Sequence, residues 1–417
     1  MERLNRMKDL VFDNDSKILF WVFDGIGGLP HPETNKTELE TADIPAIDTF
    51  ARMSSCGGLV PFGPGVTPGS GPGHLSIFGY PLDEFDLPRG VLEVLGADGA
   101  YLDGEWVGRI DPRPTDLTMR GNFASLEIRG GQKVVSDRRA NRIATEESRR
   151  VCELLSNELQ VEGYEVYVFP GKEHRFALLI RGAGLCGGLT DSDPQKSGIA
   201  PKEVEALVPE AEDAAKVANR VIKKATELLV DEPEANTVLL RGIGCAPDIP
   251  SLEELYGIKA AAIATYPMYK GIARLLGMDI LEVGSMKHED EVKTLEEHFD
   301  DYDFFYLHIK ETDSVAHKGD FDAKVEIFES CDPIFDRALE LDFDVVALTG
   351  DHCTPSVLSD HSWHPIPTAL WSETVLSGGV EFFDERQVRQ GTMGIIESRD
   401  LMPLALAEAG RFNKFGA

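Results

Sequence analysis

Residues 18–23, ILFWVF, form an uninterrupted apolar run that ends at Asp24. A strand with one face in water would alternate apolar and polar residues, so this run predicts a central strand of a parallel sheet, buried on both faces. Two later stretches repeat the pattern: residues 304–309 (FFYLHI) and residues 345–349 (VVALT), the second followed by GDH at 350–352. All three predicted strands therefore run into acidic or histidine side chains.

An amphipathic helix is predicted between the last two of these strands. Its apolar residues recur at steps of three and four: Val325, Phe328, Cys331, Phe335, Ala338 and Leu339. Pro333 interrupts the pattern, so we expect a kink or a break there. Strand–helix–strand repetition predicts an α/β domain with a central, mostly parallel sheet flanked by helices. Ligands of such sheets bind beyond the carboxyl ends of the strands.

The middle of the chain has a different composition. Residues 85–240 contain many arginines and short strand-like runs at 165–169 and 176–180. One long helix with a single apolar stripe is predicted there, formed by Ala214, Val217, Ala218, Val221, Ile222, Ala225 and Leu228. We therefore expect a smaller α+β domain at 85–240, inserted into a discontinuous core domain of residues 1–84 and 241–417.

Charge and composition exclude several functional classes. The 417 residues suffice for two or three domains. Lys plus Arg total 41 against 72 Asp plus Glu, and the net charge of −31 disfavours nucleic acid and anionic lipid as partners. The six cysteines are spread singly, which argues against a zinc ribbon or a disulfide scaffold. No secretory signal and no apolar run of about 18 residues is found, so we expect a cytoplasmic protein without a membrane partner.

Two familiar motifs are only partly matched. The segment DGIGGLP at 24–30 begins like a dinucleotide-binding fingerprint, but Pro30 stands where the third glycine belongs. Gly69-Ser70-Gly71 resembles the nucleophile elbow of hydrolases, but Pro68 stands where that motif needs glycine. Neither kind of site is therefore expected.

Acidic and imidazole side chains follow the predicted buried strands: Asp24, Asp313, His317, Asp351, His352 and His361. Any one pair alone is as well explained by a polar surface, but three groups at three strand ends favour one site. Aspartate and histidine together suit Mn²⁺, Zn²⁺ or Mg²⁺. Six such ligands exceed what one ion usually takes from protein, and two ions about 4 Å apart are suited to phosphoryl transfer.

A candidate nucleophile, Ser70, lies in a loop with glycine at positions 65, 69, 71 and 73. Glycines let the backbone approach a ligand closely, and a serine hydroxyl beside a metal loses its proton more easily. Taken alone, the loop is better explained as a flexible turn.

Several longer motifs occur in one order along the chain: FDGIGG (23–28), NKTELETADIPAIDTFA (35–51), TPGSGPGHLSIFGY (67–80), SDRRANRI (136–143), KEHRFALLIRG (172–182), TDSDP (190–194), LLRGIG (239–244), YGIKAAAIATYPMYKGIARLLGM (256–278), HIKETDSVAHKGD (308–320), TGDHCTPS (349–356) and HSWHPIPT (361–368). In these motifs the sequence resembles the cofactor-independent phosphoglycerate mutases, in particular their short, archaeal-type branch, within the alkaline phosphatase superfamily. The resemblance covers nearly the whole chain and implies an alkaline-phosphatase-like core.

The resemblance implies two divalent ions, Mn²⁺ first and Zn²⁺ or Mg²⁺ as alternatives, and no 2,3-bisphosphoglycerate. One ion would be held by Asp313, His317 and His361, with His361 preferred to His364. The other would be held by Asp24, Ser70, Asp351 and His352, with Ser70 also becoming phosphorylated.

The resemblance also implies a clamp for an anionic substrate, because arginine pairs two oxygens at once. The expected substrate-binding residues are His74, Arg120, Asn122, Arg138, Arg139, Arg142 and Arg175. Asp137 is the expected general acid or base, and Lys270 a further catalytic residue.

The expected activity is the interconversion of 3-phosphoglycerate and 2-phosphoglycerate, in glycolysis and gluconeogenesis, through phosphoserine. The alternative is a related metal-dependent phosphoryl-transfer enzyme: a phosphatase, a phosphopentomutase or a homoserine-kinase-like protein. A non-catalytic binding protein that retains the fold is a third alternative. The oligomeric state is left open.

Overall fold

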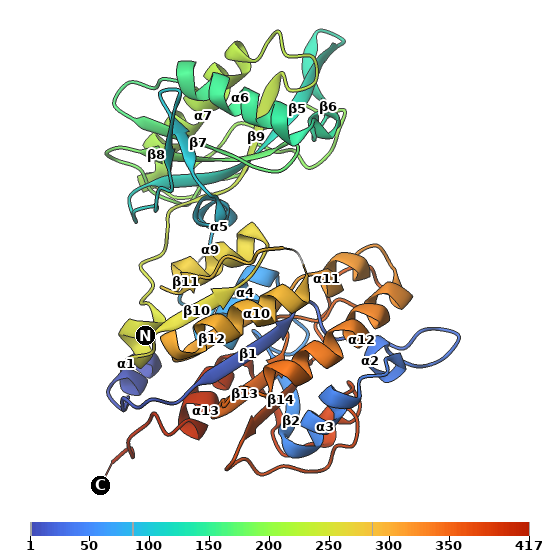
Figure 1. The fold of residues 1–417 in the computed structure, drawn as a ribbon. Helices are drawn as coiled ribbons and strands as arrows, with labels where there is room; N and C mark the ends of the chain where they lie inside the picture. Colours follow the sequence, from blue (N-terminus) through green and yellow to red (C-terminus); the bar gives the residue numbers. More distant parts are fainter. Residues whose placement is uncertain (1, 86, 286, 417) are drawn as a thin grey trace. The chain divides into compact units, whose positions relative to one another are not determined.

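A computed structural model describes residues 2–85, 87–285 and 287–416 of the chain (Figure 1). The chain divides into two compact units: a core unit, Met1–Phe85 with Ile249–Ala417, and an inserted unit, Asp86–Asp248. The boundary expected between residues 240 and 241 falls inside strand β9 (Thr237–Gly244), which pairs with the inserted unit's sheet. An apolar strand pattern identifies the strand but does not say which sheet it joins.

The core unit contains an eight-stranded sheet in the order β11-β10-β12-β1-β13-β14-β2-β15. Its strands are β1 (Ile18–Phe23), β2 (Ser55–Val60), β10 (Ala260–Ile263), β11 (Asp279–Ile280), β12 (Phe304–Ile309), β13 (Val345–Thr349), β14 (Ile366–Ser372) and β15 (Gly394–Glu397). Its helices are α1 (Glu2–Lys8), α2 (Glu38–Thr41), α3 (Pro45–Met53), α4 (Ser70–Ile77), α8 (Leu252–Tyr256), α9 (Pro267–Leu275), α10 (His288–His298), α11 (Glu311–Ala316), α12 (Phe321–Ala338) and α13 (Leu401–Glu408).

The predicted central strand is β1. All six of its residues are buried, and it pairs in parallel with β12 on one side and β13 on the other. Among the sheet's pairings, only those of β14 with β13 and with β2 are antiparallel. The expected α/β core with a mostly parallel sheet is confirmed, because a strand covered on both faces needs apolar residues at every position.

Of the kink or break expected at Pro333, the break is wrong. α12 runs from Phe321 to Ala338 as one helix through this proline. The helix is held by its buried face: Phe335 packs edge-on against Trp21 of β1 and Phe50 of α3, at ring-centroid distances of 5.2 and 5.1 Å. Tertiary packing of this kind offsets the hydrogen bond that proline removes.

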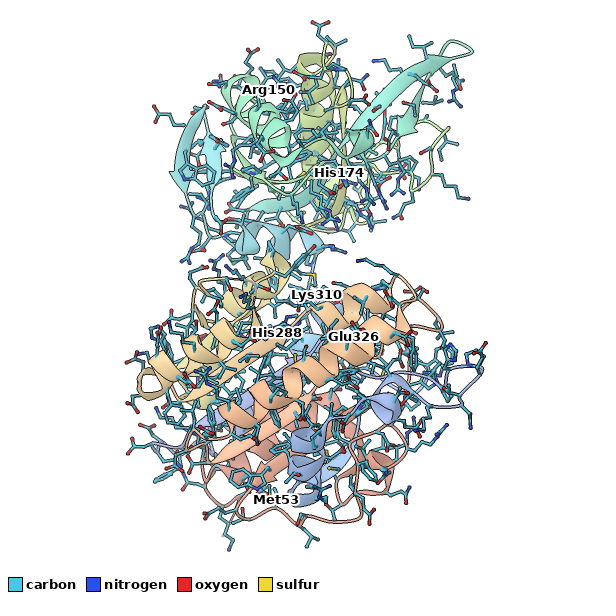
Figure 2. The ribbon with its side chains drawn as sticks, turned by 45° about the vertical axis from the view of Figure 1, so that its right-hand side comes forward. Met53, Arg150, His174, His288, Lys310 and Glu326 are labelled. Carbon is cyan, nitrogen blue, oxygen red and sulfur yellow. The ribbon has the colours of Figure 1, made fainter. Side chains whose placement is uncertain are left out.

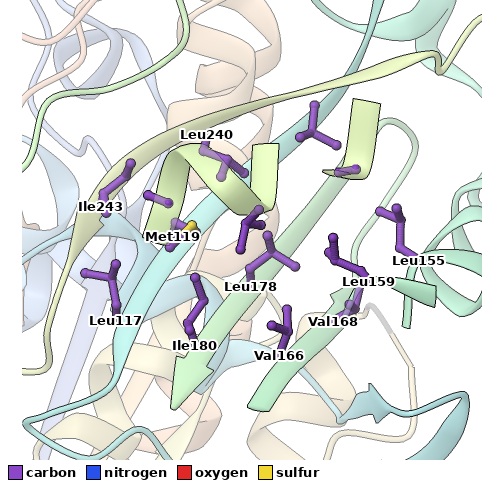
Figure 3. Close-up of a cluster of buried hydrophobic side chains, with 14 of the residues drawn as sticks. Leu117, Met119, Leu155, Leu159, Val166, Val168, Leu178, Ile180, Leu240 and Ile243 are labelled. Atoms are coloured by element: carbon purple, nitrogen blue, oxygen red, sulfur yellow. The ribbon is translucent and has the colours of Figure 1, made fainter. Parts of the chain in front are cut away.

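The inserted unit is built on an antiparallel sheet in the order β4-β3-β7-β8-β5-β6, with β9 also paired to β5. Its remaining strands are β3 (Ala100–Leu102), β4 (Glu105–Gly108), β5 (Leu117–Arg129), β6 (Gln132–Asp137), β7 (Glu165–Pro170) and β8 (Arg175–Arg181), and its helices are α5 (Arg89–Gly96), α6 (Thr145–Glu158) and α7 (Glu212–Leu228). Figure 3 shows apolar side chains of β5, β7, β8 and β9 gathered into one buried cluster. The prediction that the inserted domain belongs to the α+β class is confirmed. Across the described ranges of both units, no helix combines the length and apolar character of a bilayer span.

Replacing Phe335 by alanine is expected to lower the free energy of unfolding by about 3–5 kcal/mol, because it removes a large ring from a packed core. Chemical denaturation of the full chain measures the change. Phe382, which is 53% exposed, is the matched control, and its alanine variant should stay within about 0.5 kcal/mol of the parent. Equal stabilities for the two variants would contradict the packing role given to Phe335.

Candidate metal centre and arginine cluster

Three neighbouring parallel strands of the core unit end at one edge of its sheet. β1 lies between β12 and β13, with Phe23 in register with Ile309. Asp24 directly follows β1, α11 begins two residues after β12, and the GDH segment at 350–352 follows β13. Polar side chains far apart in sequence therefore meet at this edge.

The first group of metal-donor atoms comes from Asp313, His317 and His361, whose donor atoms lie within 4.8 Å of one another. The Nε2 atoms of His317 and His361 lie 3.3 and 3.6 Å from Asp313 Oδ1. Their Nδ1 atoms lie 3.1 Å from the Ser359 carbonyl and 2.9 Å from the Pro68 carbonyl. A carbonyl at Nδ1 favours the tautomer that leaves the Nε2 lone pair free for an ion.

The second group comes from Asp24, Asp313 and His352, again within 4.8 Å. His352 Nε2 lies 3.3 Å from Asp24 Oδ1 and 3.2 Å from Asp351 Oδ2. Thr354 Oγ1 donates to Asp313 Oδ1 at 2.8 Å and contacts His352 Nδ1 at 3.0 Å. Asp313 thus belongs to both groups, and its carboxylate lies between the two sets of donor atoms.

The protonation states of Asp24, Asp313 and His352 suit metal ligands. Burial alone would raise the pKa of Asp24, but the Lys310 ammonium and the neighbouring imidazoles hold it well below its usual value. Burial likewise opposes ionisation of Asp313, yet His317 and Lys310 keep its pKa low. Burial lowers the pKa of His352, so this ring is neutral. Ionised carboxylates and neutral imidazoles are the forms that bind divalent ions.

Unpartnered buried oxygens support the same conclusion. In the described part of the chain, Asp24 Oδ1 and Asp351 Oδ2 are buried and accept no hydrogen bond. Lys310, labelled in Figure 2, directly follows β12. Its Nζ lies 3.0 Å from Asp24 Oδ2 and also contacts Asp313 Oδ2. A single ammonium leaves several oxygens unmatched, so the donor set fits divalent cations.

Ser70 is the first residue of α4, and its Oγ lies 3.2 Å from His352 Nε2. A Cβ on Gly73 would lie only 2.3 Å from the Asp351 carbonyl oxygen, so glycine is needed for α4 to approach this loop. His74, which is expected to contact substrate, lies on α4 and is completely buried. Its Nδ1 lies 2.8 Å from the Ser70 carbonyl and 3.1 Å from Asp351 Oδ2.

The inserted unit gathers cationic side chains on adjacent strands. On β5, Asn122 is in register with Arg175 of β8, and Arg120 is in register with Arg241 of β9. Burial, followed by the neighbouring Arg175, lowers the pKa of His174 to about 4, and this ring lies inside the unit (Figure 2). Burial also lowers the pKa of Arg120 to about 10, despite Glu93 nearby, with three arginines acting in the same direction. Several cationic side chains gathered in this way, in a chain of net charge −31, suit an anionic ligand.

The other arginines expected to bind substrate differ in pairing and in exposure to solvent. Arg138 forms a bidentate pair with Asp193, at 2.8 and 2.6 Å, whereas the side chains of Arg139 and Arg142 are exposed. Asp137 accepts hydrogen bonds from two backbone N–H groups, those of Arg139 at 2.8 Å and Asn141 at 2.7 Å. These bonds hold the turn after β6.

Two remaining expectations concern the core unit. Lys270 lies on α9, where its ammonium pairs with Glu282 at 2.9 Å. His364, the alternative to His361, lies outside both donor groups and contacts Ser362 Oγ at 3.0 Å.

Comparisons with known proteins agree with this geometry. Residues 16–408 match the family model described as the metalloenzyme superfamily. The probable 2,3-bisphosphoglycerate-independent phosphoglycerate mutase of Thermotoga neapolitana is 44% identical over 418 residues, covering 100% of both chains. The chain belongs to the family of 2,3-bisphosphoglycerate-independent phosphoglycerate mutases. The protein of the same description from Aquifex aeolicus is 44% identical over 416 residues, covering 99% of both chains. The cofactor-independent phosphoglycerate mutase of Thermoplasma acidophilum has a solved structure that matches with a TM-score of 0.70 and 29% identity, covering 95% of this chain and 100% of that one.

Several residues of the two clusters, one in each unit, were missed by sequence reasoning. In the core unit these are Lys310, Thr354 and Tyr269, whose hydroxyl donates to Asp24 Oδ2. In the inserted unit they are His174 and Arg241. All five lie within the quoted motifs, but nothing in a motif says which polar side chain turns toward the site.

Two buried carboxylates support the loops after β1 and β13. Glu385 accepts hydrogen bonds from Gly28 N at 2.6 Å and Thr37 Oγ1 at 2.5 Å, and Glu38 accepts one from Ser356 N at 2.9 Å. Burial raises the pKa of Glu385 from 4.5 to about 7, and the Glu38 carboxylate acts in the same direction. Glu385 therefore keeps a proton in the folded protein that the unfolded chain releases.

The sign of the pH dependence follows from this proton. Between pH 4.5 and about 7 the folded state binds more protons than the unfolded state, so stability falls as pH rises, by up to about 3 kcal/mol. Glu385→Gln, which mimics the protonated acid, should remove this fall. Unfolding midpoints at pH 5–8 measure it, with the exposed Glu381→Gln as control. Parallel pH profiles for parent and Glu385→Gln would contradict the assignment.

Asp313→Asn is expected to weaken Mn²⁺ binding by more than about tenfold, because one charge is removed from both donor groups at once. Calorimetric titration of the metal-free protein, with metal analysis after dialysis, measures the affinity and the number of ions. Asp322→Asn, at an exposed position of α12, is the control. Unchanged Mn²⁺ affinity in Asp313→Asn would show that ions bind elsewhere.

Proposed function

We propose that this protein interconverts 3-phosphoglycerate and 2-phosphoglycerate without 2,3-bisphosphoglycerate, in the cytoplasm, as a step of glycolysis and gluconeogenesis. The observation that carries the proposal is the position of Ser70 Oγ, 3.2 Å from His352 Nε2 and beside donor groups that share Asp313. A hydroxyl in such a position is suited to accept and return a phosphoryl group. Family membership and the names of the relatives support the same reaction.

In this proposal two divalent ions, Mn²⁺ most readily, are held by the residues of the strand ends. Asp313, His317 and His361 hold one ion, and Asp24, Asp351 and His352 hold the other together with Ser70. When bound, the ions supply positive charge that stabilises the serine alkoxide and the phosphoryl oxygens.

Side chains of the protein take part directly in the transfer of the phosphoryl group and of protons. Ser70 Oγ forms a bond to phosphorus as the bond from phosphorus to the glycerate oxygen breaks, and that oxygen takes up the proton lost by serine. Return of the phosphoryl group to the other hydroxyl of glycerate reverses these changes. Asp137 is proposed to exchange protons with the glycerate hydroxyls.

The inserted unit is proposed to hold the substrate by its negative charge. Arginines pair with carboxylate and phosphate oxygens, and Arg120, Arg139 and Arg175 surround His174 with positive charge. A neutral His174 and the Asn122 amide can accept and donate hydrogen bonds to the hydroxyls of glycerate. Charge and hydrogen bonding together select a small phosphorylated carboxylate over neutral sugars.

Ser70→Ala is expected to lower mutase turnover by at least about 10³-fold, because the phosphoryl acceptor is removed. The assay contains purified protein, Mn²⁺, 3-phosphoglycerate and an enolase-coupled readout, with no 2,3-bisphosphoglycerate. Mass spectrometry of quenched reactions should detect phosphoserine in the parent and not in the variant. The control, Ser330→Ala, changes an exposed serine of α12 and should keep full activity.

Two outcomes would overturn the proposal. Substantial mutase activity in folded Ser70→Ala would rule out this nucleophile. A parent protein that lacks mutase activity would point to another substrate in the same fold, to be identified by phosphate release from p-nitrophenyl phosphate, by transfer within ribose phosphates or by phosphorylation of homoserine with ATP.

A further inference from the structure

Lys324, on α12, is a completely buried lysine whose ammonium contacts only backbone oxygens. Its Nζ donates to the carbonyls of Gly25 at 2.8 Å, Thr354 at 2.9 Å and Gly27 at 3.2 Å, which uses all three of its N–H groups. Among the described residues, no carboxylate oxygen forms an ion pair with it. The Phe328 ring lies 5.9 Å away on the same helix.

A buried ammonium without a carboxylate is costly. Removing such a charge from water has an effective cost of several kcal/mol, which hydrogen bonds to carbonyls offset only in part. A methionine or leucine would fill the same space without this cost. Lys324 is therefore expected to have a role that requires three hydrogen-bond donors on one side chain.

The three carbonyls belong to the two loops that carry metal-ligand candidates. Gly25 and Gly27 follow Asp24 at the end of β1, and Thr354 lies two residues after His352. The loops touch directly: Thr354 N donates to the Gly25 carbonyl at 3.2 Å, and a Cβ on Gly25 would lie 2.4 Å from Thr354 Oγ1. Lys324 binds carbonyls of both loops from behind.

Thr354 connects this contact to the donor groups. While its carbonyl accepts from Lys324, its hydroxyl donates to Asp313 and contacts His352 Nδ1. On the other loop, Gly25 is bonded both to the lysine, through its carbonyl, and to Asp351 Oδ1, through its N–H at 3.2 Å. The Lys324 ammonium thus binds Gly25, the residue next to Asp24 in the chain. The two residues that it binds, Thr354 and Gly25, in turn contact Asp313, His352 and Asp351.

We propose that Lys324 is a positioning residue of the metal centre: by tying together the loops after β1 and β13, it sets the spacing of Asp24, Asp313 and His352. The lysine touches neither ion nor substrate. The inference rests on the metal-ligand set given under the proposed function. Partners that orient metal ligands typically change metal affinity by about 10- to 100-fold when they are removed.

The test compares Mn²⁺ affinity in the metal-free, substrate-free full chain, by electron paramagnetic resonance of the free ion. Lys324→Met, which keeps the length and loses every donor, should weaken binding by about 10- to 100-fold. Lys324→Gln keeps two donors without the charge and should fall between Lys324→Met and the parent. Phe335→Ala is the matched control, because it destabilises the same helix without contacting either loop, and it should bind Mn²⁺ within about twofold of the parent.

Two results would overturn the role of Lys324. One is a Lys324→Met variant that binds Mn²⁺ within about twofold of the parent. The other is an equal loss of affinity in Phe335→Ala, which would make general destabilisation the cause. Where Lys324→Met does not fold, Lys324→Gln decides, and parent-like affinity in that variant overturns the proposal.

The proposed function fails separately from this inference. Mn²⁺ affinity is measured without substrate, so a parent that binds Mn²⁺ and lacks mutase activity contradicts the proposed reaction while the comparison of Lys324 variants still stands. A parent that binds no divalent ion overturns both.

Discussion

The carboxylates of Asp24, Asp313 and Asp351 lie together at one buried edge of the core sheet, where repulsion between like charges is weakly screened. Such an arrangement is stable only if positive charge lies among the oxygens. Lys310 supplies one such charge, through contacts with Asp24 and Asp313. The carboxylate oxygens that remain without hydrogen-bond partners make the site suitable for divalent cations. The hydroxyl of Ser70 lies beside the same donor groups.

The parallel order of β12, β1 and β13 makes this concentration of charge possible. Parallel neighbours deliver their carboxyl ends to one edge, so three short loops converge without long connections. The same loops need fixed geometry, and their backbone groups are bound from behind by buried side chains: Glu385 at Gly28, Glu38 at Ser356 and Lys324 at three carbonyls. Ionisable groups are rarely buried without such partners, and here their partners belong to the loops that carry the site.

The net charge of the chain does not reveal a local group of positive side chains in the inserted unit. The chain as a whole carries −31, yet β5, β8 and β9 of the inserted unit bring Arg120, Arg175 and Arg241 onto adjacent strands, and Arg120 and Arg175 lie near a neutral His174. An acidic surface and a local cationic cluster are compatible, because an anionic substrate responds to the nearby charges more strongly than to distant, screened ones. The same acidity suits carboxylate ligands in the core unit.

Sequence alone determined the central strand, the α/β class and the nomination of Asp24, Asp313, His317, Asp351, His352 and His361, because burial on both faces requires apolar runs and strand ends carry ligands. It did not show that all of β9 joins the inserted unit's sheet, that α12 continues through Pro333, or that His74 is buried. Tertiary structure alone decided these features and revealed Lys310, Thr354 and Lys324. Their roles depend on which distant backbone or carboxylate group lies within hydrogen-bond reach, and local residue patterns do not encode that distance.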